Sequence, residues 1–288
     1  MLRATFRSLF ARKLRLLLAA VAIVLGVSFA TGALVLTDTL GRTFDTLFST
    51  VNQNVAVAIR GTHTFQGGDQ SGQEAPRQTV PAATLAAART VDGVLEAQGT
   101  VLGSAVLVGT DGKAIGGQGP PQMGLNWVAS ARLNSAHLVS GRAPRGPDEI
   151  AISAFMASRG GYRVGDRAPI LTAQPARNYR IAGVFAYPGG KSSLGGETTI
   201  AFDLPTARAV LEVPAGYTEI DVAAASGVSV EALRGRVTHI LPAHTEAVTG
   251  KALADEQAAD VRSFIGFIST FLLVFAAVAL FVGAFIIF

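Results

Sequence analysis

The stretch FLLVFAAVALFVGAFIIF, residues 271–288, decides the fold, because none of its eighteen side chains is charged. The uncharged run begins earlier, at Ser263, and therefore holds 26 residues. A transmembrane helix needs roughly 20 apolar residues to cross a hydrocarbon core of about 30 Å. The sequence therefore predicts that residues 263–288 form a membrane-spanning α-helix.

A second uncharged run, LLLAAVAIVLGVSFATGALVL, covers residues 16–36. Its 21 residues are enough for another crossing, and they exceed the roughly 7–15 apolar residues of a cleaved signal peptide. Only 15% of the chain is charged, against about 25% in a typical soluble domain. We therefore expect a membrane protein with two transmembrane α-helices.

The first predicted span follows a basic amphipathic segment, residues 1–15, which contains no acidic residue. Its five basic residues are Arg3, Arg7, Arg12, Lys13 and Arg15. The positive-inside rule places this end in the cytoplasm, so residues 37–262 are predicted to be extracytoplasmic. The other 19 Lys and Arg residues are balanced by 20 Asp and Glu residues, which argues against a nucleic-acid partner.

Small residues recur on both predicted spans at helical spacing. Ala22, Gly26 and Ala30 lie four residues apart in the first, and Ala279 and Gly283 form a similar pair in the second. Small residues at this spacing let another helix approach closely. These five residues are predicted to form helix-packing faces.

Apolar residues continue at helical spacing beyond the first span, at Leu40, Phe44, Leu47 and Phe48. Before the second span, residues 252–263 contain neither Gly nor Pro. Both patterns predict that the helices extend beyond the membrane as stalks, packed through these four apolar side chains.

The segment between the stalks has the mixed pattern of an α+β domain with a β-rich inserted subdomain. Helices are expected at 81–89, 203–211 and 230–241, with Asp203 capping the second, and a hairpin turn is expected at 110–112. A polar, Gly-rich loop is expected at 61–78. Strands are expected at 55–61, within 94–115, and at 149–153, 168–172, 179–187, 198–203, 217–224 and 244–249.

No residue pattern points to catalysis or to a bound cofactor or metal. Gly190-Lys191 lacks the upstream Gly of a P-loop at the required spacing. The chain has no Cys, and no H-E-x-x-H is formed by its four histidines, His63, His137, His239 and His244. We therefore expect no enzyme activity and no catalytic, cofactor-binding or metal-binding residues in this chain.

Four segments resemble the permeases of MacB/FtsX-type ABC transporters. The opening RSLFARKLRLLLAAVAIVLGVSFATGALVLTDTL, residues 7–40, is similar to their first span and its exit. SGRAPRGPDEIAIS (140–153), GYRVGD (161–166) and YRIAGVF (179–185) follow the order and spacing of their extracytoplasmic core. The resemblance covers the whole chain.

The resemblance implies the membrane subunit of an ABC transporter in a bacterial cell membrane. It implies a separate cytoplasmic ATPase that binds and hydrolyses ATP, a second permease copy, and coupling of hydrolysis to movements of the extracytoplasmic domain. Members of the family continue into a third and fourth span, so this chain is expected to correspond to their N-terminal half. The substrate stays open among lipid, peptide, lipoprotein and drug.

Two other functions fit the same arrangement of spans and domain. A sensory receptor also has an extracytoplasmic domain between two spans, with an output domain after the second. A membrane-bound scaffold of cell-wall or division machinery is the other alternative. The sequence following residue 288 would separate a permease, which has further spans, from a receptor.

Overall fold

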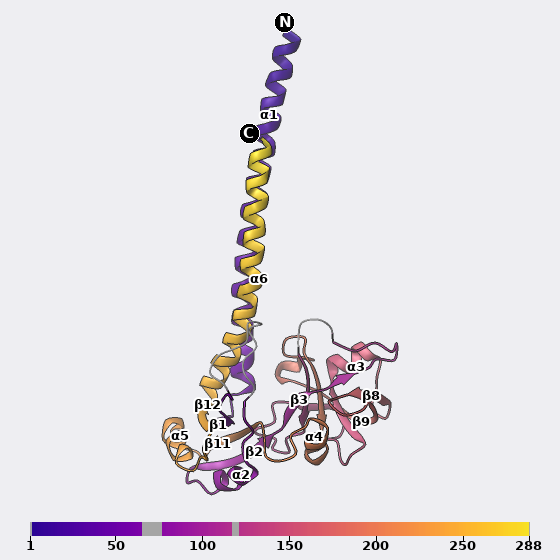
Figure 1. Ribbon diagram of the computed structural model, residues 1–288, viewed down its shortest axis with the longest axis vertical. Coiled ribbons are helices and arrows are strands. Elements are labelled where there is room, and N and C mark those ends of the chain that lie inside the picture. Colours follow the sequence, from indigo (N-terminus) through magenta and orange to yellow (C-terminus); the bar gives the residue numbers. More distant parts are fainter. Residues whose placement is uncertain (1, 65–76, 117–120, 288) are drawn as a thin grey trace. The chain divides into compact units, whose positions relative to one another are not determined.

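The computed structural model describes residues 2–64, 77–116 and 121–287, although several side chains of the two long helices lie outside this description. The chain forms two compact units. Met1–Phe48 and Asp255–Phe288 make up one, and Ser49–Ala254 make up the other. The chain passes between them within helix α1 and again within helix α6 (Figure 1).

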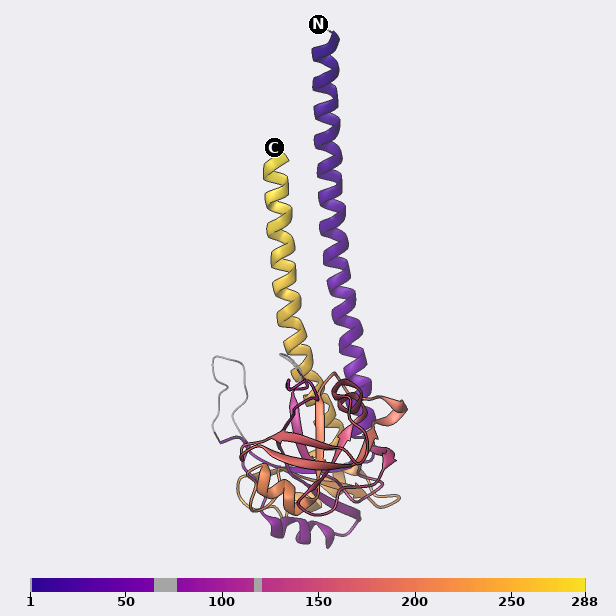
Figure 2. The ribbon, with the colours of Figure 1, turned by 90° about the vertical axis from the view of Figure 1, so that its right-hand side faces the viewer.

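The first unit is a pair of antiparallel helices that lie side by side (Figures 1 and 2). They belong to α1, Leu2–Val51, and α6, Gly250–Ile287. In the described part of the chain, one helical segment, Gly250–Val278, is long and apolar enough to cross a membrane, and its most apolar stretch of 18 residues has a mean hydropathy of 2.0. Several side chains of the span predicted at 16–36 lie outside the description, so two crossings remain a prediction.

A four-stranded antiparallel sheet with the order β12-β1-β11-β2 forms one part of the second unit, as far as the structure describes it. Its strands are β1 (Val57–Gly61), β2 (Val94–Thr100), β11 (Glu219–Ala224) and β12 (Thr245–Thr249). Helices α2 (Ala82–Arg89) and α5 (Val230–Thr238) bury Leu85 and Leu233 in the same core as Ile59 and Ile220. These two helices therefore cover one face of the sheet.

The other part of this unit is an eight-stranded mixed sheet, counted over the described residues. Its order is β3-β5-β10-β7-β9-β8-β4, and β6 pairs with β9. Its strands are β3 (Leu102–Ser104), β4 (Val106–Leu107), β5 (Gln122–Asn126), β6 (His137–Gly141), β7 (Glu149–Ser153), β8 (Arg167–Leu171), β9 (Arg177–Ala186) and β10 (Thr198–Phe202). Helices α3 (Ala154–Gly160) and α4 (Leu204–Val210) also belong to this part (Figure 1). A short 3-10 turn, Pro188–Gly190, completes it.

One continuous apolar core joins the two sheets. It contains Ile59 and Ile220 from the four-stranded sheet together with Ile150 and Ile200 from the eight-stranded sheet, all fully buried. Smaller apolar clusters lie on the opposite faces of both sheets. The mixed α+β fold predicted from the sequence is confirmed.

The local predictions succeeded where the sequence carries a turn or capping signal. Asp203 caps α4 by accepting a hydrogen bond from the backbone N–H of Thr206 at 3.2 Å. The predicted 110–112 turn closes where the N–H of Gly112 donates to the carbonyl of Gly109. Helix α5 ends at Thr238, three residues before its predicted end, and the predicted loop at 61–78 falls largely on residues outside the description.

Strands β5 and β6 and helix α3 were not predicted. The β5 sequence, QMGLN, has little strand preference, and it is a strand because β10 pairs with it in parallel and β3 pairs with it antiparallel. Helix α3 is only seven residues long. The sequence signals for this helix are Ser153, which caps its N-terminus, and Gly161, which follows its last residue in a left-handed backbone conformation.

Candidate functional site

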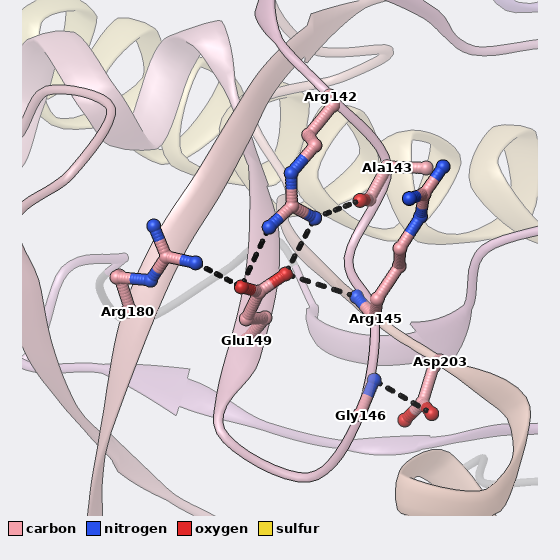
Figure 3. Close-up of polar contacts among 7 residues, drawn as sticks. All are labelled: Arg142, Ala143, Arg145, Gly146, Glu149, Arg180 and Asp203. Atoms are coloured by element: carbon pink, nitrogen blue, oxygen red, sulfur yellow. Dashed lines mark hydrogen bonds and ion pairs between the residues drawn. The ribbon is translucent and has the colours of Figure 1, made fainter.

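The GRAPRGPDE segment, residues 141–149, wraps around the carboxylate of Glu149 (Figure 3). Arg142 binds it with both terminal nitrogens, Nη1 to Oε2 at 2.6 Å and Nη2 to Oε1 at 2.7 Å. The backbone N–H of Arg145 donates to Oε2 at 3.1 Å, and Arg180 on β9 also pairs with Oε1. Glu149 is therefore held by two guanidinium groups and one backbone amide.

Backbone geometry fixes the path of this segment on both sides of Arg142. Gly141 has a φ of +73°, and a Cβ added there would lie 2.2 Å from the carbonyl oxygen of Ala182. The N–H of Gly146 donates to Oδ2 of Asp203 at 3.1 Å (Figure 3). Asp203 therefore both caps α4 and ties the segment to it.

The environment of Glu149 keeps its carboxylate ionised. The Arg142 hydrogen bonds lower the pKa of Glu149 from 4.5 to about 2, against the opposing effect of burial, and the Arg145 amide and the Arg180 charge lower it further. A carboxyl group with this pKa holds no proton near neutral pH, so it is unsuited to acid–base chemistry there. Its evident role is to hold the segment on the sheet.

The other two motifs of the extracytoplasmic core meet this segment on β9. Within GYRVGD, the carboxylate of Asp166 accepts a hydrogen bond from the N–H of Arg163 at 2.7 Å, and the N–H of Gly165 donates to the carbonyl of Ile181 at 2.8 Å. Ile181 and Arg180 belong to the YRIAGVF strand. Three motifs that are separate in the sequence thus form one structural unit around β7 and β9.

The helix pair contains most of the site residues predicted from the sequence. Along α1, residues with restricted exposure recur every three or four positions, at Gly26, Ala30, Ala33, Thr37, Leu40, Phe44 and Leu47. On α6 the corresponding residues are Ala258, Val261, Ile265, Ser269, Leu272 and Ala276. This spacing is typical of a helix face that packs against another helix.

The predicted packing residues differ in how much of them the structure describes. Five of them are half-buried: Gly26, Ala30, Leu40, Phe44 and Phe48. The ring of Phe48 stacks on that of Phe44, with centroids 6.2 Å apart. Leu47 is buried, with 4% of its surface exposed. The side chains of Ala22, Ala279 and Gly283 lie outside the described residues, as do those of the basic segment except the exposed Lys13. Their packing and topological roles stay predictions.

Some residues at the contact between the two helices were not predicted from the sequence. Gly41 is buried, and a Cβ added there would lie 3.7 Å from Cγ of Arg262 on α6. Arg262 forms an ion pair with Asp45. Ala33, Ser269 and Ala276 are also buried, and their small side chains could have been found by extending the spacing of the predicted faces.

Large apolar side chains cover the outside of both helices. On α1 the exposed ones are Leu17, Val21, Val24, Val27, Phe29, Leu34, Val35 and Leu36. On α6 they are Phe267, Ile268, Phe271, Val274, Phe275, Val278 and Phe281. A contiguous apolar surface of this kind marks a face that contacts lipid or protein.

The described residues contain no group of three or more His, Asp or Glu side chains that could hold a metal ion. His137 lies on β6 of the eight-stranded sheet. His239 is the C-cap of α5, the helix that covers the four-stranded sheet. Absence of enzyme activity and of a cofactor stays a prediction.

Comparisons with known proteins agree with this fold. The sequence model of the MacB-like periplasmic core domain matches residues 16–240. The periplasmic region of MacB from Actinobacillus actinomycetemcomitans superposes with a TM-score of 0.51 at 10% identity, covering 71% of this chain and 94% of that one. The extracellular domain of the noncanonic ABC-type transporter YknZ from Gram-positive bacteria gives a TM-score of 0.45 at 12% identity, covering 67% and 99%.

No curated protein matches the sequence. The family match covers well over half of the chain, and the similarity to the MacB periplasmic region shows the same fold independently. The chain therefore belongs to the family of MacB-like periplasmic core domains, found in permeases of ABC-type transporters.

Proposed function

We propose that this chain acts as the membrane subunit of an ABC transporter, with residues 37–262 outside the cytoplasm. The observation that carries the proposal is the family match over residues 16–240, which includes the whole of the first predicted span, residues 16–36. The exposed apolar surfaces of α1 and α6 support it, because such side chains are stable facing lipid. The basic residues before position 16 favour a cytoplasmic N-terminus.

In this proposal the chain pairs with a second permease copy. A separate ATPase hydrolyses ATP and thereby moves the helix pair. The chain enters the extracytoplasmic unit through α1 and leaves it through α6, so both junctions are helical. A continuous helix transmits a displacement along its axis better than a flexible linker does. The unit would then act on the substrate by changing its position or shape.

Single-cysteine labelling tests the topology, since the natural chain has no Cys. Ala173→Cys lies in an exposed segment between β8 and β9, and Ser8→Cys lies in the basic N-terminal segment. A membrane-impermeant maleimide should label position 173 in spheroplasts and position 8 only after lysis. Labelling of position 8 but not 173 before lysis would place the domain in the cytoplasm and overturn the proposal.

Coupling to an ATPase needs its own experiment. The chain, carrying Asp45→Cys and Arg262→Cys, would be co-expressed and purified with a candidate ABC ATPase from the same organism and cross-linked with a short bis-maleimide. These positions form an ion pair across the helix pair. We expect co-purification and a cross-linking yield that changes on vanadate trapping with ATP. Failure of the ATPase to co-purify, or an unchanged yield, would contradict the coupling.

A further inference from the structure

A small apolar cluster packs the ends of both long helices onto the four-stranded sheet, on the face opposite α2 and α5. Its buried members are Val55, Ala58, Leu133, Ala223 and Leu253, and we name these five residues the root cluster. Val55 lies shortly after the end of α1, Leu253 lies in the first turn of α6, and Leu133 belongs to the segment between β5 and β6. The side-chain amide of Asn54 holds this segment by donating to the carbonyl of Arg132 at 3.0 Å.

Asp221 lies beside the root cluster on the same face of the sheet. It is directly opposite Ala58 on β1, and Ala223 follows it two residues later on β11. Residues directly opposite each other have Cβ atoms about 5 Å apart, and alternate residues of a strand project on the same face. Two of the five members of the root cluster are therefore immediate neighbours of the Asp221 side chain.

The carboxylate of Asp221 is buried without compensation. Its Oδ1 atom is shielded from solvent and accepts no hydrogen bond. Burial raises the pKa of Asp221 well above its ordinary value, and the acidic neighbour Glu219 raises it further. An ionised carboxylate in such a place lowers its free energy by taking up a proton or by reaching water.

The charged side chains on the surrounding elements do not neutralise Asp221. Arg60 on β1 lies opposite Glu219, but its Nε binds Glu246 on β12 at 2.9 Å. The others are Glu96 on β2, Arg132 in the segment between β5 and β6, and Lys251 and Asp255 on α6. The chain from residue 49 to residue 55, at the end of α1, carries no charge. Within the described structure, no cation forms an ion pair with Asp221.

Opening of the root cluster would let water reach Asp221, because two members of the cluster flank it. For protonated Asp221 this opening brings little electrostatic gain. For ionised Asp221 it removes the cost of holding a charge away from water. The equilibrium between the closed and the open root cluster therefore depends on whether Asp221 holds a proton.

We propose that Asp221 is a proton-operated switch at the roots of the two helices. Its protonated form keeps the root cluster closed, and its ionised form favours local opening, which loosens the attachment of α6 to the sheet. The proposal rests on the proposed function only for its setting, in which the switch would respond to the pH outside the cytoplasm. Because the folded-state pKa lies above the ordinary 3.8, protection is greatest below this value and falls as the pH rises toward the folded-state pKa.

Hydrogen exchange of the full chain in phosphatidylcholine nanodiscs tests the switch, with rates between pH 4 and pH 7 corrected for the intrinsic exchange rate. The reporter peptides cover residues 128–134 and 251–258, and a reference peptide covers β7. The test variant, Asp221→Asn, removes the charge and keeps the shape. The control, Glu96→Gln, removes a carboxylate from the same face, opposite Ala223.

At pH 7 the reporter peptides of the wild type should exchange faster than β7, because the root cluster opens while the rest of the unit stays folded. In Asp221→Asn they should exchange about fivefold more slowly than in the wild type at pH 7, and equally at pH 4. Glu96→Gln should follow the wild type at both pH values.

Two outcomes would overturn the switch. Reporter peptides as protected as β7 would show that the root cluster opens only when the whole unit unfolds. Reporter exchange that is the same in Asp221→Asn and the wild type, while the melting temperature of the variant rises, would show that Asp221 acts only on global unfolding. Labelling at position 173 decides the proposed function separately, so either proposal can fail alone.

Discussion

Two carboxylates of the same compact unit, Glu149 and Asp221, occupy opposite electrostatic environments. Glu149 begins β7 of the eight-stranded sheet and is held by Arg142 and Arg180. Asp221 lies in the middle of β11 of the four-stranded sheet, two residues from Glu219 on the same face. The Oδ1 atom of Asp221 is buried and has no hydrogen-bond partner.

Their pKa values move in opposite directions for this reason. Arginine hydrogen bonds lower the pKa of Glu149 to about 2. Burial, with the repulsion and hydrogen bond of Glu219, raises the pKa of Asp221 well above its ordinary value. Burial opposes ionisation at both positions, so the neighbouring charges decide the outcome. One carboxylate therefore stabilises the fold near neutral pH, and the other costs stability there.

The largest expected effect is the loss of the Glu149 carboxylate. Glu149→Ala leaves Arg142 and Arg180 facing each other without an anion, and should lower the free energy of unfolding by about 2 kcal/mol. Both arginine side chains are 44% exposed and can be hydrated, which keeps the loss below that of a fully buried pair. Thermal melting of the full chain in detergent, followed by the fluorescence of Trp127, would measure it.

Arg145→Gln is the matched control for that change. Arg145 contributes only its backbone N–H to Glu149, so replacing its side chain should leave the melting temperature within about 1 °C of the wild type. Trp127 reports on the relevant unit because its ring contacts Phe185 on β9, with centroids 5.8 Å apart. Equal melting temperatures for Glu149→Ala and the wild type would show that the pairing does not stabilise the fold.

Acid should remove the contribution of Glu149 over a defined range. The folded-state pKa of about 2 lies below the ordinary 4.5, so the folded protein binds fewer protons than the unfolded chain between these values. The stabilisation is complete above pH 4.5 and is lost as the pH falls toward 2. The melting difference between wild type and Glu149→Gln should shrink over this range, and a difference that stays constant would contradict the assigned pKa.

Asp221→Asn should have the opposite sign and a smaller size. The folded state favours protonated Asp221, so the wild type loses stability as the pH rises above the ordinary value of 3.8. Replacement by a neutral amide should raise stability at pH 7 by about 1 kcal/mol, a melting shift of about 2–4 °C, and should have no pH-linked benefit at pH 3. A lower melting temperature at pH 7 would show that Asp221 forms a favourable ionised contact.

The comparison also explains what the sequence could predict. The strand at 149–153, the Asp203 cap and the 110–112 turn follow from local signals within a few residues. The partners of Glu149 do not, because Arg180 is 31 residues away and reaches it only through the pairing of β7 with β9.

For both carboxylates, the sequence did not predict the contacts that depend on strand pairing. The sequence predicted only that a strand begins at Glu149, and the resemblance identified the motif at 140–153 without its geometry. The proximity of Glu219 to Asp221 follows from strand alternation. The burial of Asp221, which sets its pKa, depends on neighbouring strands.

The smallest expected effect separates burial from pairing. Asp148 immediately precedes Glu149 and also pairs with an arginine, Arg177, yet its side chain is 61% exposed where that of Glu149 is 11% exposed. Exposed ion pairs contribute roughly 0–1 kcal/mol and weaken in salt, because water solvates both charges well when they are apart. Asp148→Asn should therefore change the unfolding free energy by no more than about 0.5 kcal/mol, and the change should vanish in 1 M NaCl. A loss as large as that of Glu149→Ala would mean that one exposed ion pair fixes the segment as strongly as the buried carboxylate does with its two arginine partners and the Arg145 amide.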